Sequence, residues 1–179
     1  MKIIDVETYV LLADNYDPSL TSSAQDTCLV IIKTDEGIEG YGECDTSPWV
    51  AKAFIESPGT HTMDQCVKEI LIGSDPLEID LLWEKIYIGT AMTGRRGAGV
   101  NAMSAIDMAL WDIKGKALNK PVFELMGGKE QDFVIPYASL QPSLQHASSF
   151  SSQKVLDNLP RLLNRMVYSR IFSQPHTNW

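Results

Sequence analysis

Apolar and β-branched residues in the first part of the chain follow the pattern of β-strands. Residues 3–12 and 27–34 are rich in valine and isoleucine, and residues 38–43 continue the pattern. Between the last two segments, Asp35-Glu36-Gly37 is typical of a tight hairpin, because glycine supplies the positive φ that such turns require. The pattern therefore predicts a three-stranded antiparallel sheet.

Helical spacing replaces strand spacing from about residue 49. Residues 79–86 carry apolar side chains at helical intervals, and Asp75-Pro76 before them predicts an N-cap with proline in the first turn. A short helix is expected after Pro121, with its stop at Gly127-Gly128. The strongest helix is expected at about 100–118, with one apolar stripe toward the core: Met103, Ile106, Leu110, Ile113 and Ala117.

These elements predict an α+β fold in which a helical bundle follows the sheet. On the long helix, Asp112 and Lys116 are spaced four apart in the acid-first order that favours an ion pair. A last strand is expected at 133–140. Beyond it, residues 155–171 form one helix-like stretch, which Pro160 interrupts.

The composition changes near Pro142. Residues 1–142 carry 22 acidic and 11 basic residues, whereas residues 143–179 carry one acid and four bases. All 12 glycines precede that point. We therefore divide the chain into a domain at 1–130, a strand region at 131–142 and an atypical Ser-rich basic tail at 143–179.

Charge and cysteine content exclude several classes of function. The net charge of −8 offers no basic surface for nucleic acid. The longest apolar run is too short for a membrane span and the acidic start does not resemble a signal peptide, so we expect a cytoplasmic protein. Cys28, Cys44 and Cys66 have no CxxC spacing and no nearby histidine pair, which favours reduced, part-buried thiols over a disulfide framework or a zinc site.

Two segments resemble a known family. Residues 102–116, AMSAIDMALWDIKGK, continuing through Pro121-Val122 to Gly127-Gly128, are similar to the N-terminal signature of the mandelate racemase and muconate lactonizing enzyme family, which belongs to the enolase superfamily. Residues 34–43, TDEGIEGYGE, are similar to a second motif of the same domain, at a fitting distance. Among the members of the family, the sugar-acid dehydratases, which act on galactonate or mannonate, resemble this sequence most in its general character.

The resemblance implies a two-part enzyme, in which an α+β cap covers a (β/α)-barrel that carries Mg²⁺ and the acid and base residues. The reaction would be abstraction of the proton α to a carboxylate, by a lysine or histidine, in a small-molecule substrate such as a sugar acid. A barrel needs about 200 residues, so we expect only its truncated first strand at 131–142. This chain alone would then hold no catalytic residue and no Mg²⁺, and would be inactive.

Other chemistry-bearing residues are interpreted as structural. Lys114 and Lys116 match the Lys-x-Lys pattern of the family's catalytic lysines. However, side chains two positions apart on a helix point roughly 200° away from each other, which favours surface or ion-pairing roles. Asp107 and Asp112 do not share a helix face, and a structural role is again favoured. The remaining interpretations are a solvated strand edge for Glu36, Glu39, Glu43 and Asp45, a solvated loop for Arg95-Arg96, and no catalytic role for His61, His146 and His176.

The resemblance leaves one set of candidate contacts. In the family, the loops after the first and third strands fold over the barrel mouth, where they exclude water and select the substrate. The corresponding segments here are 14–26 and 45–59. Tyr16, Asp17 and Trp49 are our candidates for substrate contact, because an aromatic face beside a polar group suits a hydroxylated acid.

Three hypotheses remain open for the chain as a whole. The first is an incomplete enolase-superfamily enzyme, whose barrel is replaced near residue 142 by an unrelated reading frame. The second is a stand-alone, non-catalytic cap module that binds a partner, itself or an intact homologue through an apolar surface. The third is an unrelated α+β binding protein that shares the motifs by chance.

Overall fold

The predicted sheet forms from the three segments with strand periodicity. The computed structural model describes residues 1–18, 25–45, 47–131 and 133. Strands β1 (Ile3–Leu12), β2 (Asp26–Thr34) and β3 (Glu39–Cys44) pair antiparallel in the order β1-β2-β3. Gly37 turns the hairpin between β2 and β3 at a φ of 79°, a conformation that costs glycine little. The three-stranded sheet and its hairpin are confirmed.

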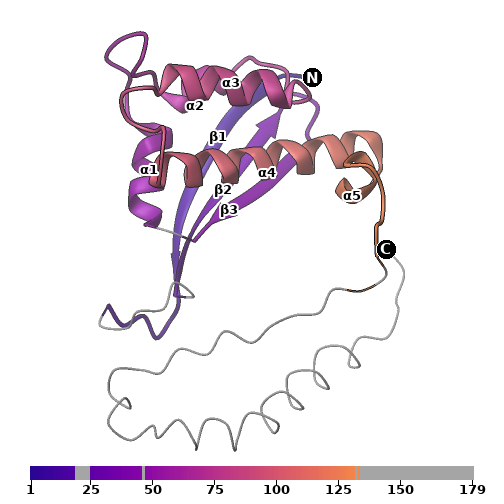
Figure 1. Cartoon of the computed structure of the whole chain (residues 1–179), viewed down its shortest axis with the longest axis horizontal. Helices are drawn as coiled ribbons and strands as arrows, with labels where there is room; N and C mark the ends of the chain where they lie inside the picture. Colours follow the sequence, from indigo (N-terminus) through magenta and orange to yellow (C-terminus); the bar gives the residue numbers. More distant parts are fainter. Residues whose placement is uncertain (19–24, 46, 132, 134–179) are drawn as a thin grey trace, which may run out of the picture. The chain divides into compact units, whose positions relative to one another are not determined.

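The side chains of β2 show why the sheet has one buried face. Alternate residues of a strand point to opposite faces, and every second residue of β2 from Cys28 to Thr34 is buried. The residues between them are only half-buried. One face of the sheet therefore lies against the helices, and Figure 1 shows the long helix α4 crossing it.

Helices follow the sheet along the chain. Helix α4 packs on β3 and β2, α1 packs on α4 and on β1 and β2, and α2 and α3 pack on each other beside them. Their core is a single cluster of apolar side chains, the largest of which come from β1, β2 and four of the helices. The helices are α1 (Pro48–Glu56), α2 (Val67–Leu71), α3 (Ile79–Gly89), α4 (Ala98–Leu118) and α5 (Val122–Leu125).

Two glycines bring α4 into backbone contact with β3. A Cβ atom on Gly42 would lie 1.9 Å from the carbonyl oxygen of Ala105, and one on Gly40 would lie 2.1 Å from that of Ala109. No side chain fits at either distance. The helix can therefore lie this close to the strand only because the two facing strand positions carry no Cβ.

Polar groups of α4 also occupy the outer edge of β3. Asp112 Oδ2 accepts a hydrogen bond of 2.9 Å from the Tyr41 backbone N–H, and Lys116 Nζ donates one of 2.7 Å to the Glu39 carbonyl oxygen. The two side chains form the predicted ion pair, at 2.7 Å. Because an edge strand exposes unpaired backbone groups that can pair with another chain, these contacts protect β3.

Three details differ from the sequence-based expectations. Helix α3 begins at Ile79, because Asp75 accepts a bond of 3.0 Å from the Leu77 N–H and so holds a turn before the helix. Ala117 is exposed, whereas the other four members of the predicted stripe are buried. Segment 45–59, predicted as a loop, contains helix α1. Apart from Phe133, the strand expected at 133–140 lies outside the described residues, as does the helix-like stretch at 155–171.

Candidate functional site

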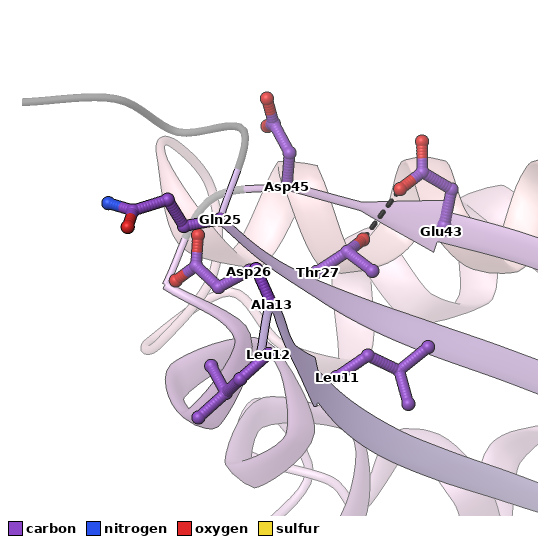
Figure 2. A pocket seen from close by; sticks show the side chains of 8 residues that line it. All are labelled: Leu11, Leu12, Ala13, Gln25, Asp26, Thr27, Glu43 and Asp45. Carbon is purple, nitrogen blue, oxygen red and sulfur yellow. Dashed lines mark hydrogen bonds between the residues drawn. The ribbon is translucent and has the colours of Figure 1, made fainter. Parts of the chain in front are cut away.

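A shallow depression of about 490 Å³ lies where β1 ends, β2 begins and β3 ends. We refer to it as the sheet-end depression. Figure 2 shows the two leucine side chains on one side of it and, on the other, the carboxylates of Glu43 and Asp45, which point in the same direction. Its lining residues are Leu11, Leu12, Ala13, Gln25, Asp26, Thr27, Glu43 and Asp45.

Local pairing explains how these side chains come together. Backbone pairing continues past the sheet, because the Ala13 N–H donates to the Gln25 carbonyl oxygen at 2.7 Å. Thr27 Oγ1 lies 2.5 Å from Glu43 Oε2 and 3.1 Å from the Cys44 carbonyl oxygen. Either of these two oxygens of β3 can accept the hydroxyl proton. Figure 2 shows the first of these bonds. The antiparallel pairing of β2 with β3 therefore holds the polar side of the sheet-end depression.

The lining favours one kind of chemistry. Asp26, Glu43 and Asp45 bring three carboxylates, which accept hydrogen bonds from hydroxyl groups and repel an anion. The leucine side chains add an apolar wall. The sheet-end depression therefore suits the hydroxylated part of a small molecule better than a carboxylate group.

Tyr16 and Asp17 lie in the segment after β1, beside the sheet-end depression in sequence but outside its lining. The Gln25 side chain holds this segment at its base, because its Oε1 accepts from the Asp17 N–H at 2.9 Å and its Nε2 donates to the Asp17 carbonyl oxygen at 3.1 Å. Tyr16 is exposed and Asp17 is half-buried. The structure thus leaves the Tyr16 ring available to solvent above an anchored backbone.

Trp49 occupies a different setting from the one predicted. It is the second residue of α1, after Pro48, which suits the first turn of a helix because it needs no N–H partner there. The Ser47 carbonyl oxygen accepts from the N–H groups of Val50 and Ala51 at 2.9 and 3.0 Å. Trp49 is 51% exposed, so its indole projects from a rigid helical turn rather than from a loop.

Sequence reasoning missed Gln25 and Thr27 as site residues. The hairpin was the available signal, because the β2–β3 register that it sets pairs Cys28 with Cys44 and Leu29 with Glu43, which puts Thr27 near Glu43. The acidic residues predicted to form one cluster lie at opposite ends of β3. Glu43 and Asp45 line the sheet-end depression, whereas Glu39 accepts from the Tyr41 hydroxyl at 2.6 Å nearer the hairpin.

The lysines of α4 have the structural roles that were predicted. Lys116 lies over the Tyr41 ring at 4.6 Å from its centroid, and Lys114 lies over the Trp111 ring at 5.1 Å. Burial, with a smaller effect from Asp80, raises the pKa of the half-buried Asp107 carboxyl. Both lysines therefore lie against aromatic rings of the same domain.

The other residues considered as catalytic or binding candidates lie in surface turns or outside the described residues. Arg95 lies 5.5 Å from the centroid of the Tyr87 ring, and His61 Nδ1 accepts from the Met63 N–H at 3.2 Å in a tight turn. His146 and His176 lie outside the described residues. These contacts give the arginine and the first histidine positions in surface packing.

A polar network between α1 and β1 fixes the helix that carries Trp49. Lys52 Nζ donates to the Thr8 carbonyl oxygen at 2.9 Å and pairs with Glu56 at 2.7 Å, and the buried Thr8 hydroxyl donates to the same Glu56 oxygen. Burial opposes ionisation of Glu56, but the hydrogen bonds from Lys52 and Thr8 outweigh it and lower the pKa of this carboxyl. The position of α1 on the sheet therefore depends on a charged pair and one buried hydroxyl.

The part of the chain that the structure describes does not fit a metal ion. No three histidine, cysteine, aspartate or glutamate side chains among those residues gather closely enough to hold one. Within the same residues, no helix is long and apolar enough to cross a membrane.

The residues that line the sheet-end depression can supply hydrogen bonds and apolar contact.

Comparison with known proteins agrees with this architecture. A sequence model described as "Mandelate racemase / muconate lactonizing enzyme, N-terminal domain" matches residues 10–127. A crystal structure of the 3,6-anhydro-D-galactonate cycloisomerase from Zobellia galactanivorans is 32% identical, with a TM-score of 0.58 over 73% of this chain and 33% of that one. Both the sequence and the fold of the described domain therefore have relatives in one superfamily.

The match to curated relatives covers only a part of each relative. A D-galactonate dehydratase from Cronobacter sakazakii is 41% identical over 112 residues, which is 60% of this chain and 26% of that protein. An arabinonate dehydratase from Saccharolobus solfataricus is 37% identical over 101 residues, which is 56% of this chain and 25% of that protein. The chain thus spans about a quarter of the length of these relatives. By the match across its sheet and helices, it belongs to the mandelate racemase and muconate lactonizing enzyme family of the enolase superfamily, through that family's N-terminal domain.

Proposed function

We propose that residues 1–130 form the capping domain of a Mg²⁺-dependent enzyme that abstracts the proton α to the carboxylate of a sugar acid. The reaction would be a dehydration or a racemisation or epimerisation. The observation that carries the proposal is the family match over residues 10–127, which spans β2, β3 and all five described helices. The sugar-acid dehydratases among the relatives support the substrate class.

The role of this domain would be to hold the substrate rather than to transform it. The sheet-end depression offers carboxylates and an apolar wall, which suit the hydroxyl groups and carbon chain of a sugar acid. Tyr16, Asp17 and Trp49 would contribute contacts from the segments on either side of it. The acidic lining would direct the substrate carboxylate away from this domain, toward the part of the enzyme that performs the chemistry.

Metal binding and proton transfer would depend on residues beyond the described ones. The described side chains do not fit a metal ion, so Mg²⁺ would be held by other residues. We propose that residues 131–142 begin the barrel, that 143–179 are a separate segment, and that the 179-residue chain alone is inactive. Three free cysteines agree with a reducing, cytoplasmic setting for the enzyme.

Activity assays of two proteins test this function. The 179-residue chain is incubated with Mg²⁺ and D-galactonate or arabinonate, and the carbonyl group that dehydration creates is trapped as a semicarbazone. A chimera in which residues 1–127 replace the matching domain of the Cronobacter sakazakii enzyme is assayed in the same way. We expect no product from the chain and Mg²⁺-dependent product from the chimera.

Either of two results would contradict the proposal. Turnover by the purified 179-residue chain would refute its inactivity, and a folded chimera without activity on either acid would refute the capping role. In that second case a module that binds a partner becomes the better explanation.

Neighbouring residues on α1 offer a matched test of substrate contact. Trp49 is 51% exposed and Val50 is 53% exposed, so truncation of either leaves the core intact. In the chimera, we expect Trp49→Ala to raise KM about ten-fold, which corresponds to about 1.4 kcal/mol of binding. Val50→Ala is expected to leave KM unchanged, and equal effects of the two substitutions would remove Trp49 from the site.

A further inference from the structure

Two cysteines lie directly opposite each other on neighbouring strands. Cys28 of β2 and Cys44 of β3 are Cα partners in the antiparallel register, so their side chains point to the same face of the sheet. Both are free thiols, and both are buried. The third cysteine, Cys66, lies beside α2 and its thiol is directed to the Ile55 carbonyl oxygen at 3.7 Å. Only the first two are thus placed to react with each other.

The strand register sets their separation. Thr34 N–H donates to the Ile38 carbonyl oxygen across the hairpin, and this pattern repeats at every second pair down to Cys28 and Cys44. Directly opposed residues at such pairs have Cα atoms about 5.5 Å apart, which lies within the range of about 4.4–6.8 Å found in disulfides. The Cβ atoms of such a pair start farther apart than in an ideal disulfide. A bond between the two sulfurs would therefore need only a small adjustment of the two strand ends.

Interaction between the two thiols favours one of them as the nucleophile. A hydrogen bond from Cys44 to the sulfur of Cys28 lowers the pKa of Cys28, and the same contact together with burial raises the pKa of Cys44. Burial opposes the Cys28 thiolate, as does Glu56 more weakly, whereas the Lys52 ammonium group favours it. Since the thiolate is the reactive form of cysteine, Cys28 would attack first.

The two cysteines lie at the strand ends that border the sheet-end depression, and they point to the helix-covered face of the sheet. Thr27, Glu43 and Asp45, which precede or follow them in sequence, line the depression. Cys44 is also the last residue of β3 and remains 8% exposed. Strand ends open locally more readily than strand centres, so opening of the ends of β2 and β3 would expose the two sulfurs to an oxidant while the rest of the domain stays folded.

We propose that Cys28 and Cys44 form a reversible intramolecular disulfide when the pool of low-molecular-weight disulfides becomes oxidised. The Cys28 thiolate attacks one sulfur of oxidised glutathione, which breaks its S–S bond and releases one glutathione thiolate. The Cys44 sulfur then attacks Cys28 in the mixed disulfide and releases the second. The two protein thiols lose two electrons and two protons in total, and the oxidant becomes two glutathione thiols.

The bond would act on the sheet-end depression. It would join the start of β2 to the end of β3, next to Thr27, Glu43 and Asp45. Oxidation would therefore restrict the separation of the two strands that carry the polar lining. Reduction by excess glutathione would restore their freedom.

Redox titration of the 179-residue chain tests the proposal. The folded chain is equilibrated in mixtures of reduced and oxidised glutathione, the free thiols are alkylated, and the peptides are mapped by mass spectrometry. We expect a Cys28–Cys44 peptide pair that lacks two hydrogen atoms, with Cys66 alkylated throughout. The equilibrium constant for this bond is expected to be at least about ten-fold larger in the folded chain than in guanidinium, because the register holds the sulfurs together.

Two variants identify the origin of the bond. Cys66→Ser is expected to titrate like the parent chain, and Cys44→Ser is expected to leave Cys28 as a glutathione adduct or a free thiol. The proposal is overturned if Cys28 and Cys44 stay separately alkylated at the most oxidising ratio, or if Cys66 takes part. Equal equilibrium constants in folded and unfolded chains would also overturn it, and this comparison does not depend on the folding of any variant.

Discussion

The contact between β3 and α4 gives the sharpest test of the packing argument. Gly42→Ala would place a Cβ atom 1.9 Å from the Ala105 carbonyl oxygen, whereas ordinary contacts begin at 3.4 Å. Helix and strand would have to separate by about 1.5 Å, and a gap of 0.5–1 Å already removes a quarter to a half of the dispersion energy of facing atoms. Because the position of a Cβ atom is fixed by its own backbone and the Ala105 oxygen is also backbone, no side-chain rotation relieves the clash.

The expected cost lies at the upper end of the range for overpacked cores, about 3 kcal/mol. Gly37→Ala is the matched control, because a Cβ there meets nothing within 4 Å and the substitution only forces alanine to a φ of 79°. That strain costs about 1–2 kcal/mol. Comparing the two substitutions separates steric overlap from backbone conformation.

Urea denaturation followed by tryptophan fluorescence measures both variants, since Trp111 lies on α4 and is half-buried. We expect the Gly42→Ala midpoint to fall well below that of Gly37→Ala. If Gly42→Ala were no more destabilising than Gly37→Ala, the close approach of α4 to β3 would be wrong.

Three further substitutions test the core, the edge of β3 and the α1 network. Ile106→Ala should cost about 2–5 kcal/mol in urea unfolding, whereas Ala117→Ser at an exposed position of the same helix should change the midpoint little. Lys116→Met should cost about 1 kcal/mol or less, because its ion pair is part-exposed; a larger loss would show that the edge contacts stabilise more than a surface pair does. Glu56→Gln tests pH dependence: since the folded pKa of Glu56 lies below its ordinary value of 4.5, its ionised form stabilises the fold above that value, and the benefit disappears as pH falls through the folded pKa. Unfolding midpoints of the parent and Glu56→Gln should therefore differ at pH 7 and approach each other as the pH falls below 4.5, and a constant difference would contradict this assignment.

The long elements were predictable because burial imposes a period on them. The valine and isoleucine content placed β1 and β2 within a residue of their observed bounds, and the stripe from Met103 to Ile113 identified the buried face of α4. Ala117 fails because it lies in the last turn of α4, where the residues after Gly115 are exposed. A periodic pattern thus predicts a helix well but does not tell how far its covered length extends.

The short elements near the candidate site were harder to predict for a physical reason. Helix α1 has nine residues and buries only Pro48, Ala51 and Ile55, so its apolar stripe is too brief to stand out from a loop. Its start was nevertheless marked by Ser47-Pro48, a common opening of a helix. The chemistry of the Trp49 side chain could therefore be predicted from the sequence, whereas its position on a helix could not.

The sheet-end depression shows that a site can follow from register rather than from a motif. Thr27 and Glu43 are 16 positions apart and Cys28 and Cys44 are too, so neither pair stands out when the sequence is read as spacing alone. Once Gly37 closes the hairpin, the antiparallel pairing brings both pairs together, because each step away from the turn on one strand is matched by a step on the other. The same turn thereby determines the polar lining and the opposed thiols.

The polar groups at the two ends of the sheet have different surroundings. At the hairpin end, Asp112 and Lys116 fill backbone positions on the β3 edge, and Glu36 pairs with the Met1 ammonium group at 3.2 Å. At the other end, Glu43 accepts from the Thr27 hydroxyl, and Glu43 and Asp45 line the sheet-end depression. A rigid, internally paired sheet that presents polar groups at one end is the arrangement by which folds position ligand contacts. The backbone contact at Gly42 is then also a requirement of the site, because it fixes the strand that carries Glu43.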